Sequence, residues 1–181
     1  MSKKSWHIST ISHKYHACCH GLHATLEALS GAQVDPERLA SIRIRTHPRW
    51  MSVCNIADPK TGLEAKFSYA QVAAMAILGH ATGRIENFND AMTRDPQVRA
   101  LRDIVEVMED ESLTETQAQV TLTLKSGEVR RLRHDLMAPI TLEARSLKLR
   151  AKVDALLSED RAAPLWQAVI GQDLEAVTAT F

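Results

Sequence analysis

The side chains that could do chemistry are concentrated in one short run near the amino terminus. It contains His13, His16, His20 and His23, with Lys14 among them. An imidazole can shuttle a proton at neutral pH, and it is also a common metal ligand. A lysine ammonium is a compact positive charge that can hold a carboxylate or a developing anion. The run therefore indicates either proton transfer next to a carboxylate or metal binding.

Metal binding is one interpretation of this run. His16 and His20 are four residues apart, as are Cys19 and His23, so on a helix either pair could clamp one ion. However, Gly21 does not enforce a helix through the whole run, and no second cluster of Cys, His or carboxylate residues follows at a useful distance. The alternative metal site is thus His16, Cys19, His20 and His23.

Each of these residues also has a purely structural interpretation. Lys14 could be a solvated surface lysine. His23 shares a helix face with Leu22 and Leu26 and could be a satisfied core histidine. The cysteines Cys18 and Cys19 are better packing residues than nucleophiles, because nothing beside them in sequence marks a lowered thiol pKa.

The elements that must position these side chains are a mixture of helices and strands. Apolar residues at helical spacing predict helices over residues 19–29 and 141–158, an alanine-rich and buried helix over 68–78 with Ser68 as its N-cap, and a helical tail over 166–181. Two short helices are expected at residues 87–92 and 95–101. Alternation of apolar and polar residues predicts strands over 39–45 and 118–124, and the turn at Ser126-Gly127 predicts a hairpin partner over 129–133. A further strand is expected over 104–108.

Together these elements predict a single α+β domain over residues 1–181, with a small antiparallel sheet of three to four strands covered by helices. The formal net charge is zero and 45% of residues are hydrophobic, which favours a globular chain with no nucleic-acid partner. No apolar run is long enough for a membrane span, there is no secretory signal, and three cysteines make a poor disulfide framework. We therefore expect a cytoplasmic protein.

Three segments, in order and in register, resemble the second domain of the MmgE/PrpD family. The first is Lys14 followed by a cysteine-bearing loop and by His23 nine residues on. The second is the turn at residues 58–62 with the Glu-Ala-Lys-Phe-Ser stretch and the helix after it. The third runs from Gly83 to Val107. The resemblance covers residues 6–124 well and the tail loosely.

The resemblance implies a lyase or isomerase that acts on a carbon next to a carboxylate. The family includes 2-methylcitrate dehydratases, cis-aconitate decarboxylases and iminodisuccinate epimerases, and it uses no metal and no organic cofactor. Lys14 and His23 fall where the family has catalytic residues. Tyr69 and Gln71 fall where an aromatic residue borders the substrate, although the family has that aromatic at position 71. The substrate would be a small di- or tricarboxylate.

The resemblance also implies a partner, because the family's active site lies between this small domain and a larger helical domain that the sequence does not contain. Half a cleft cannot enclose a substrate. We therefore expect a separate helical-domain subunit, and a homo- or hetero-oligomer rather than a monomer. The alternatives are a truncated or repurposed binding module without catalysis, and a His/Cys metal-binding protein.

Overall fold

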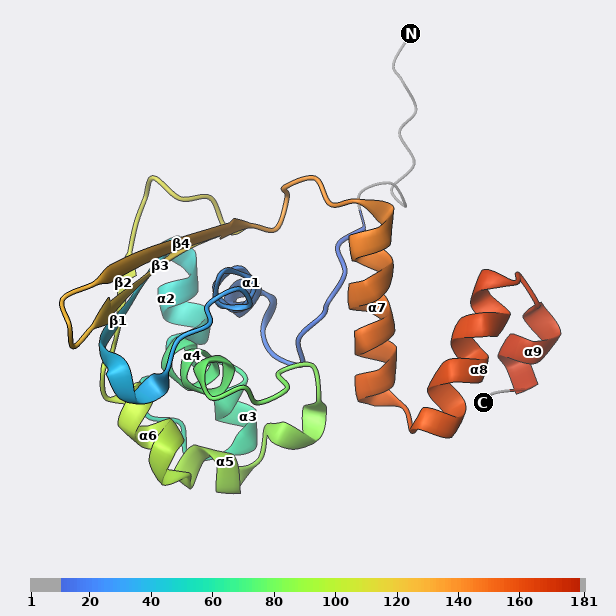
Figure 1. The fold of residues 1–181 in the computed structure, drawn as a ribbon, viewed down its shortest axis with the longest axis horizontal. Coiled ribbons are helices and arrows are strands. Elements are labelled where there is room, and N and C mark those ends of the chain that lie inside the picture. Colours follow the sequence, from blue (N-terminus) through green and yellow to red (C-terminus); the bar gives the residue numbers. More distant parts are fainter. Residues whose placement is uncertain (1–10, 180–181) are drawn as a thin grey trace, which may run out of the picture.

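The computed structural model describes residues 11–179 and contains a four-stranded sheet with helices packed around it (Figure 1). The strand order is β2-β1-β3-β4. The strands are β1 (Leu39–Thr46), β2 (Val105–Glu109), β3 (Gln117–Leu124) and β4 (Val129–Asp135). All four strands lie where the sequence predicts them, and the α+β class is confirmed.

The expectation of a purely antiparallel sheet is wrong at one edge. β1 pairs with β3, and β3 with β4, in antiparallel fashion, but β1 and β2 run parallel. Between β1 and β2 the chain passes through the helices α2 to α6, and a long crossover of this kind brings the second strand back in the same direction. The sheet is therefore mixed.

Alternation along the strands decides which face of the sheet is buried. Ile42 and Ile44 in β1 are fully buried, as are Val120 and Leu122 opposite them in β3. The residues between them, such as Arg43, point to solvent. Because successive side chains in a strand point to opposite faces, this pattern gives one apolar face and one polar face.

Two helices form the core layer against the buried face of the sheet. α1 (His23–Leu29) packs on β3 and β4, and α4 (Tyr69–Ile77) packs on α1, α6 and β2. Ser68 caps α4, as predicted, because its Oγ accepts a hydrogen bond from the Gln71 amide at 3.2 Å. The predicted helix over 19–29 begins as a 3₁₀ turn, His20–Leu22, and becomes α-helical at His23.

Four short helices complete the body of the domain. They are α2 (Arg49–Cys54), α3 (Gly62–Ala65), α5 (Asp90–Arg94) and α6 (Pro96–Arg102). α3 begins with a capping box, in which the Thr61 hydroxyl accepts from the Glu64 amide and the Glu64 carboxylate accepts from the Thr61 amide. α6 begins at Pro96 behind the Asp95 cap, as expected.

The last three helices lie beside the body rather than on its core. They are α7 (Leu142–Leu156), α8 (Glu159–Ile170) and α9 (Leu174–Ala179), and Figure 1 shows α8 and α9 beyond α7, away from the sheet. No residue of α7 is fully buried, and Leu142 in its first turn is 79% exposed. α7 lies within the helix predicted over 141–158, but the tail predicted over 166–181 is two helices, of which α8 begins at Glu159 and α9 follows a break at residues 171–173. Leucines such as Leu147 and Leu174 leave much of the apolar surface of these helices uncovered. Residues 180–181 of the predicted tail lie outside the described part.

Within residues 11–179, none of the helices combines the length and the apolar character that a membrane crossing requires.

Candidate active site

Three histidine rings meet at the start of α1. The 3₁₀ turn brings the ring of His20 to 4.8 Å from the ring of His23, centroid to centroid. His16, in the segment that leads into this turn, has its ring edge-on to His23 at 5.0 Å. His23 is 1% exposed and therefore lies behind the other two, which are partly open to solvent. We call His16, His20 and His23 the histidine cluster.

The position of His16 is fixed by polar contacts on both ring nitrogens. Its Nδ1 lies 2.7 Å from the Thr82 hydroxyl oxygen, and its Nε2 lies 3.3 Å from Glu27 Oε1. Glu27 is one turn beyond His23 on α1, and its other carboxylate oxygen accepts a hydrogen bond from Lys148 of α7. A chain of polar contacts thus runs from α7 to the histidine cluster.

Burial sets the protonation state of His23. Its pKa falls to about 3, first because of burial and then because of the neighbouring His16, His20 and Lys14, although a hydrogen bond with the Cys18 backbone acts in the opposite direction. Its buried Nε2 has no hydrogen-bond partner among the described residues. At neutral pH His23 is therefore a neutral imidazole. Because a base works best when its pKa lies near the operating pH, a pKa this low makes His23 a weak proton acceptor.

Glu27 is ionised in this arrangement. Burial would raise the pKa of its carboxyl group, but hydrogen bonds from His16 and Lys148 outweigh burial and lower it to about 2. Because the carboxylate contacts both His16 and Lys148, it holds both side chains in place.

Lys14 lies at the rim of a surface pocket of about 490 Å³. The same pocket is lined by His16 and His20 and by two further lysines, Lys66 and Lys152. We call it the lysine pocket. The residues that were predicted to be catalytic thus lie close together: Lys14 is at the pocket, and His23 is behind the histidines that line it. The catalytic roles of Lys14 and His23 stay predictions.

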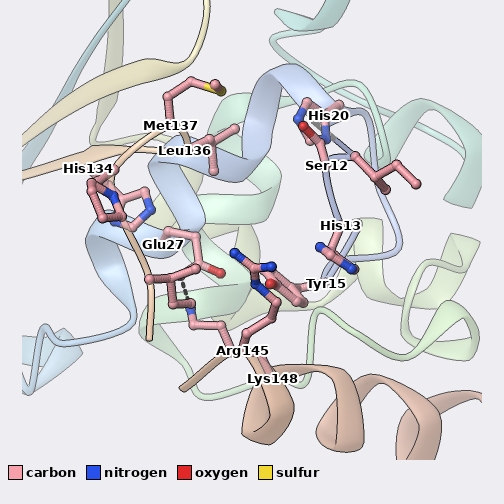
Figure 2. Close-up of a pocket in the computed structure, with 14 residues that line it drawn as sticks. Ser12, His13, Tyr15, His20, Glu27, His134, Leu136, Met137, Arg145 and Lys148 are labelled. Carbon is pink, nitrogen blue, oxygen red and sulfur yellow. Dashed lines mark hydrogen bonds and ion pairs between the residues drawn. The ribbon is translucent and has the colours of Figure 1, made fainter. Parts of the chain in front are cut away.

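A second cavity, of about 370 Å³, lies on the other side of His20 (Figure 2). Figure 2 shows the ion pair between Glu27 and Lys148, drawn as a dashed line. His134 from β4 and Arg145 from α7 also line the cavity. Burial lowers the pKa of His134. Among its described lining residues this cavity has one carboxylate, that of Glu27, which is paired with Lys148, and one further cation, Arg145.

Tyr69 and Gln71, predicted to bind substrate, lie in the core with no exposed surface. The Tyr69 hydroxyl donates to the Gly21 carbonyl at 2.8 Å and lies 2.8 Å from the Thr46 hydroxyl. Gln71 Oε1 accepts from Arg102 Nη1 at 2.9 Å. Tyr69 thus holds the 3₁₀ turn that carries His20, whereas Gln71 contacts α6 instead. A direct contact of either side chain with substrate stays a prediction.

Among residues 11–179, no group of three or more His, Cys, Asp or Glu side chains is arranged to hold a metal ion. The alternative site at His16, Cys19, His20 and His23 therefore gains no support from the fold. Cys18 is buried and its pKa is raised to about 12, first by burial, which fits a packing residue.

Sequence reasoning missed Glu27, Lys66, Lys148 and Lys152. Glu27 carried one signal, its position at i+4 from His23 on a predicted helix, which places both side chains on one face. The three lysines carried none, because they reach the site from segments that are distant in sequence.

The comparison with protein families supplies one further finding. The model of the MmgE/PrpD C-terminal domain matches residues 16–170. The matched range includes the histidine cluster and begins two residues after Lys14. A search of curated proteins finds no match.

Proposed function

The chain belongs to the MmgE/PrpD family through its C-terminal domain, and from this premise we propose that it is the small-domain part of a lyase or isomerase that acts beside a carboxylate, without metal or organic cofactor. A 2-methylcitrate dehydratase-like reaction on a small di- or tricarboxylate is the specific activity that we propose. A separate helical domain or subunit would complete the active site.

The observation that carries the proposal is the juxtaposition of Lys14 with the histidine cluster. Abstraction of a proton next to a carboxylate needs a neutral base and a cation that stabilises the enolate-like anion. His16 and His20 line the pocket, and His23 behind them is kept neutral by burial. Lys14 is the cation at the same pocket. In the proposed mechanism, the cluster takes up the proton and Lys14 holds the developing negative charge. The hydroxyl group on the neighbouring carbon then leaves as water, protonated by an acid that the helical partner would supply.

The uncovered apolar residues on the last three helices support the proposal of a partner. Leu142, Leu147 and Leu174 are 79%, 64% and 78% exposed. A soluble chain that leaves this much apolar surface on adjacent helices gains by covering it with another subunit. We propose that a helical subunit covers this surface and closes the site.

The test is to purify the tagged chain with its partner from its native cells and to assay the complex on 2-methylcitrate, cis-aconitate and iminodisuccinate. Lys14→Ala and His23→Ala should each lower turnover by roughly 10²–10⁴-fold. Lys125→Ala, which removes an exposed lysine in the β3–β4 turn, is the matched control and should leave turnover unchanged.

Two results would contradict the proposal. One is a complex with full turnover in both the Lys14 and the His23 variants. The other is a stable complex that turns over none of these carboxylates, and this result would favour a binding module instead.

A further inference from the structure

The three lysines of the lysine pocket come from segments that are distant in sequence. Lys14 comes from the segment before α1, Lys66 from the end of α3, and Lys152 from α7. All three ammonium groups act electrostatically on the thiol of Cys18, which lies at the base of the pocket. The three positive charges therefore converge on one place rather than being scattered over the surface.

Hydrogen bonds hold the backbone around the three lysines. The Cys19 amide donates to the Lys66 carbonyl at 2.9 Å, which ties the end of α3 to the segment that carries Lys14. The Ala17 amide donates to the Thr82 carbonyl at 2.8 Å, and Lys152 Nζ donates to the neighbouring Gly83 carbonyl at 2.9 Å. The lysines are thus presented from fixed backbone, which lowers the entropy lost on binding a ligand.

The charges of the pocket are not compensated by its own lining. None of the described residues that line it is an Asp or a Glu. The pKa of Lys152 is lowered, first by burial and then by repulsion from Lys14, while Cys18 and the nearby carboxylate of Glu86, which is outside the lining, act in the opposite direction. The cavity of Figure 2 differs, because Glu27 lies within it and is paired with Lys148. Of the two, the lysine pocket is the one that lacks an anion.

Apolar side chains line the rest of the lysine pocket. Leu63, Phe67, Ile85 and Leu156 lie among the lysines. Leu63, Ile85 and Leu156 are each at least half exposed, so their side chains are available to contact the carbon chain of a ligand. A pocket with three ammonium groups and an apolar wall suits a short carbon chain that carries two or three carboxylates.

We propose that Lys66 and Lys152 bind the non-reacting carboxylates of a di- or tricarboxylate substrate, while Lys14 lies next to the reacting carbon. This inference rests on the proposed function and deepens it, because it identifies the residues that select a substrate with several carboxylates. It also gives α7 a role, which is to bring Lys152 to a pocket formed otherwise by the body of the domain.

The test is calorimetric titration of the full chain with tricarballylate, an unreactive tricarboxylate, at low ionic strength. Each of Lys66→Gln and Lys152→Gln should weaken binding by roughly tenfold or more, since each removes a charge-assisted contact. Lys125→Gln removes the same charge outside the pocket and should leave the affinity unchanged. Circular dichroism of each variant establishes that the fold is retained, and Lys152→Arg, which keeps the charge, should recover most of the affinity.

Three outcomes would overturn the inference. They are an absence of tricarballylate binding by the intact chain, an equal loss of affinity in Lys125→Gln, and equally tight binding of inorganic phosphate, which would indicate a general anion site. Binding does not depend on turnover, so the two proposals can fail separately. A chain that binds tricarballylate through Lys66 and Lys152 but forms no active complex would contradict the proposed function and leave the carboxylate site intact.

Discussion

At the scale of single residues, the site depends on how burial sets charge. His23 shows this most clearly, because it is almost fully enclosed and lies beside two other imidazoles. A protonated His23 would be a desolvated cation among other nitrogen groups, so the fold keeps it neutral. The enclosure of His23 therefore makes the stability of the protein sensitive to acid.

This sensitivity can be measured. The pKa of His23 is about 3 in the folded chain, against an ordinary value of 6.5, so the unfolded chain binds a proton below pH 6.5 that the folded chain does not. The free energy of unfolding should therefore fall as the pH falls from 6.5 toward 3, with His23 contributing about 1 kcal/mol per pH unit. Urea unfolding at pH 7.5, 6, 5 and 4 would show this, and His23→Gln should flatten the slope.

Above pH 7.5 His23 is neutral in both states, so the slopes of the wild-type chain and of His23→Gln should coincide there, which gives an internal control. His20 also has a pKa lowered by burial and by Lys14, and it is present in both proteins. Equal slopes of the two proteins below pH 6 would show that His23 is not buried in its neutral form.

At the scale of elements, α3 is the short helix that places Lys66. The capping box fixes its first turn, and the Gly62 amide donates to Asp90 Oδ1 at 2.8 Å, which joins α3 to α5. Gly62 is also packed directly against the backbone between these helices. A Cβ at this position would lie 2.6 Å from Asn89 Cα and even closer to the Phe88 carbonyl oxygen.

Gly62→Ala should therefore destabilise the domain by roughly 1–3 kcal/mol, because neighbouring backbone cannot move aside as a flexible side chain can. Urea unfolding at pH 7.5 measures the change. Gly31→Ala is the matched control, since a Cβ at Gly31 meets no atom within 4 Å, and we expect it to be neutral or slightly stabilising. Equal stabilities of the two variants would contradict the close packing of α3 on α5.

At the scale of the whole molecule, the sheet and its core layer form a body, and α7, α8 and α9 form an arm beside it (Figure 1). The two parts are joined by polar contacts from α7, namely Lys148 to Glu27 and Lys152 to the Gly83 carbonyl. α7 contributes no fully buried residue, so it adds little apolar area to the core. The exposed leucines on the arm are free to contact another subunit.

We expect the purified chain to self-associate at micromolar concentration when its partner is absent, because exposed apolar surface on the arm becomes covered in a dimer or larger oligomer. Sedimentation velocity would measure this. The double change Leu147→Glu and Leu174→Glu should shift the distribution toward monomer, whereas Lys125→Glu in the exposed β3–β4 turn, outside the arm, should not. A wild-type chain that sediments as a monodisperse monomer would contradict this expectation.

The sequence by itself determined the elements of this protein and the place of its chemistry. Period-two alternation predicted β1 and β3, since one face of each strand must meet the core, and the turn at residues 126–127 predicted β4 as the second strand of a hairpin. Capping residues such as Ser68 and Asp95 marked helix starts, because they satisfy free amides locally. The histidine-rich run and its resemblance to the MmgE/PrpD family indicated the family that the comparison then found.

Only the tertiary structure decided how distant residues meet. The parallel pairing of β1 with β2 depends on the path of the crossover, which local patterns do not specify. Lys152 lies 138 positions after Lys14, and nothing in the spacing of the two lysines indicates that they line one pocket. The neutral state of His23 likewise follows from enclosure, which is a property of packing and not of sequence neighbours.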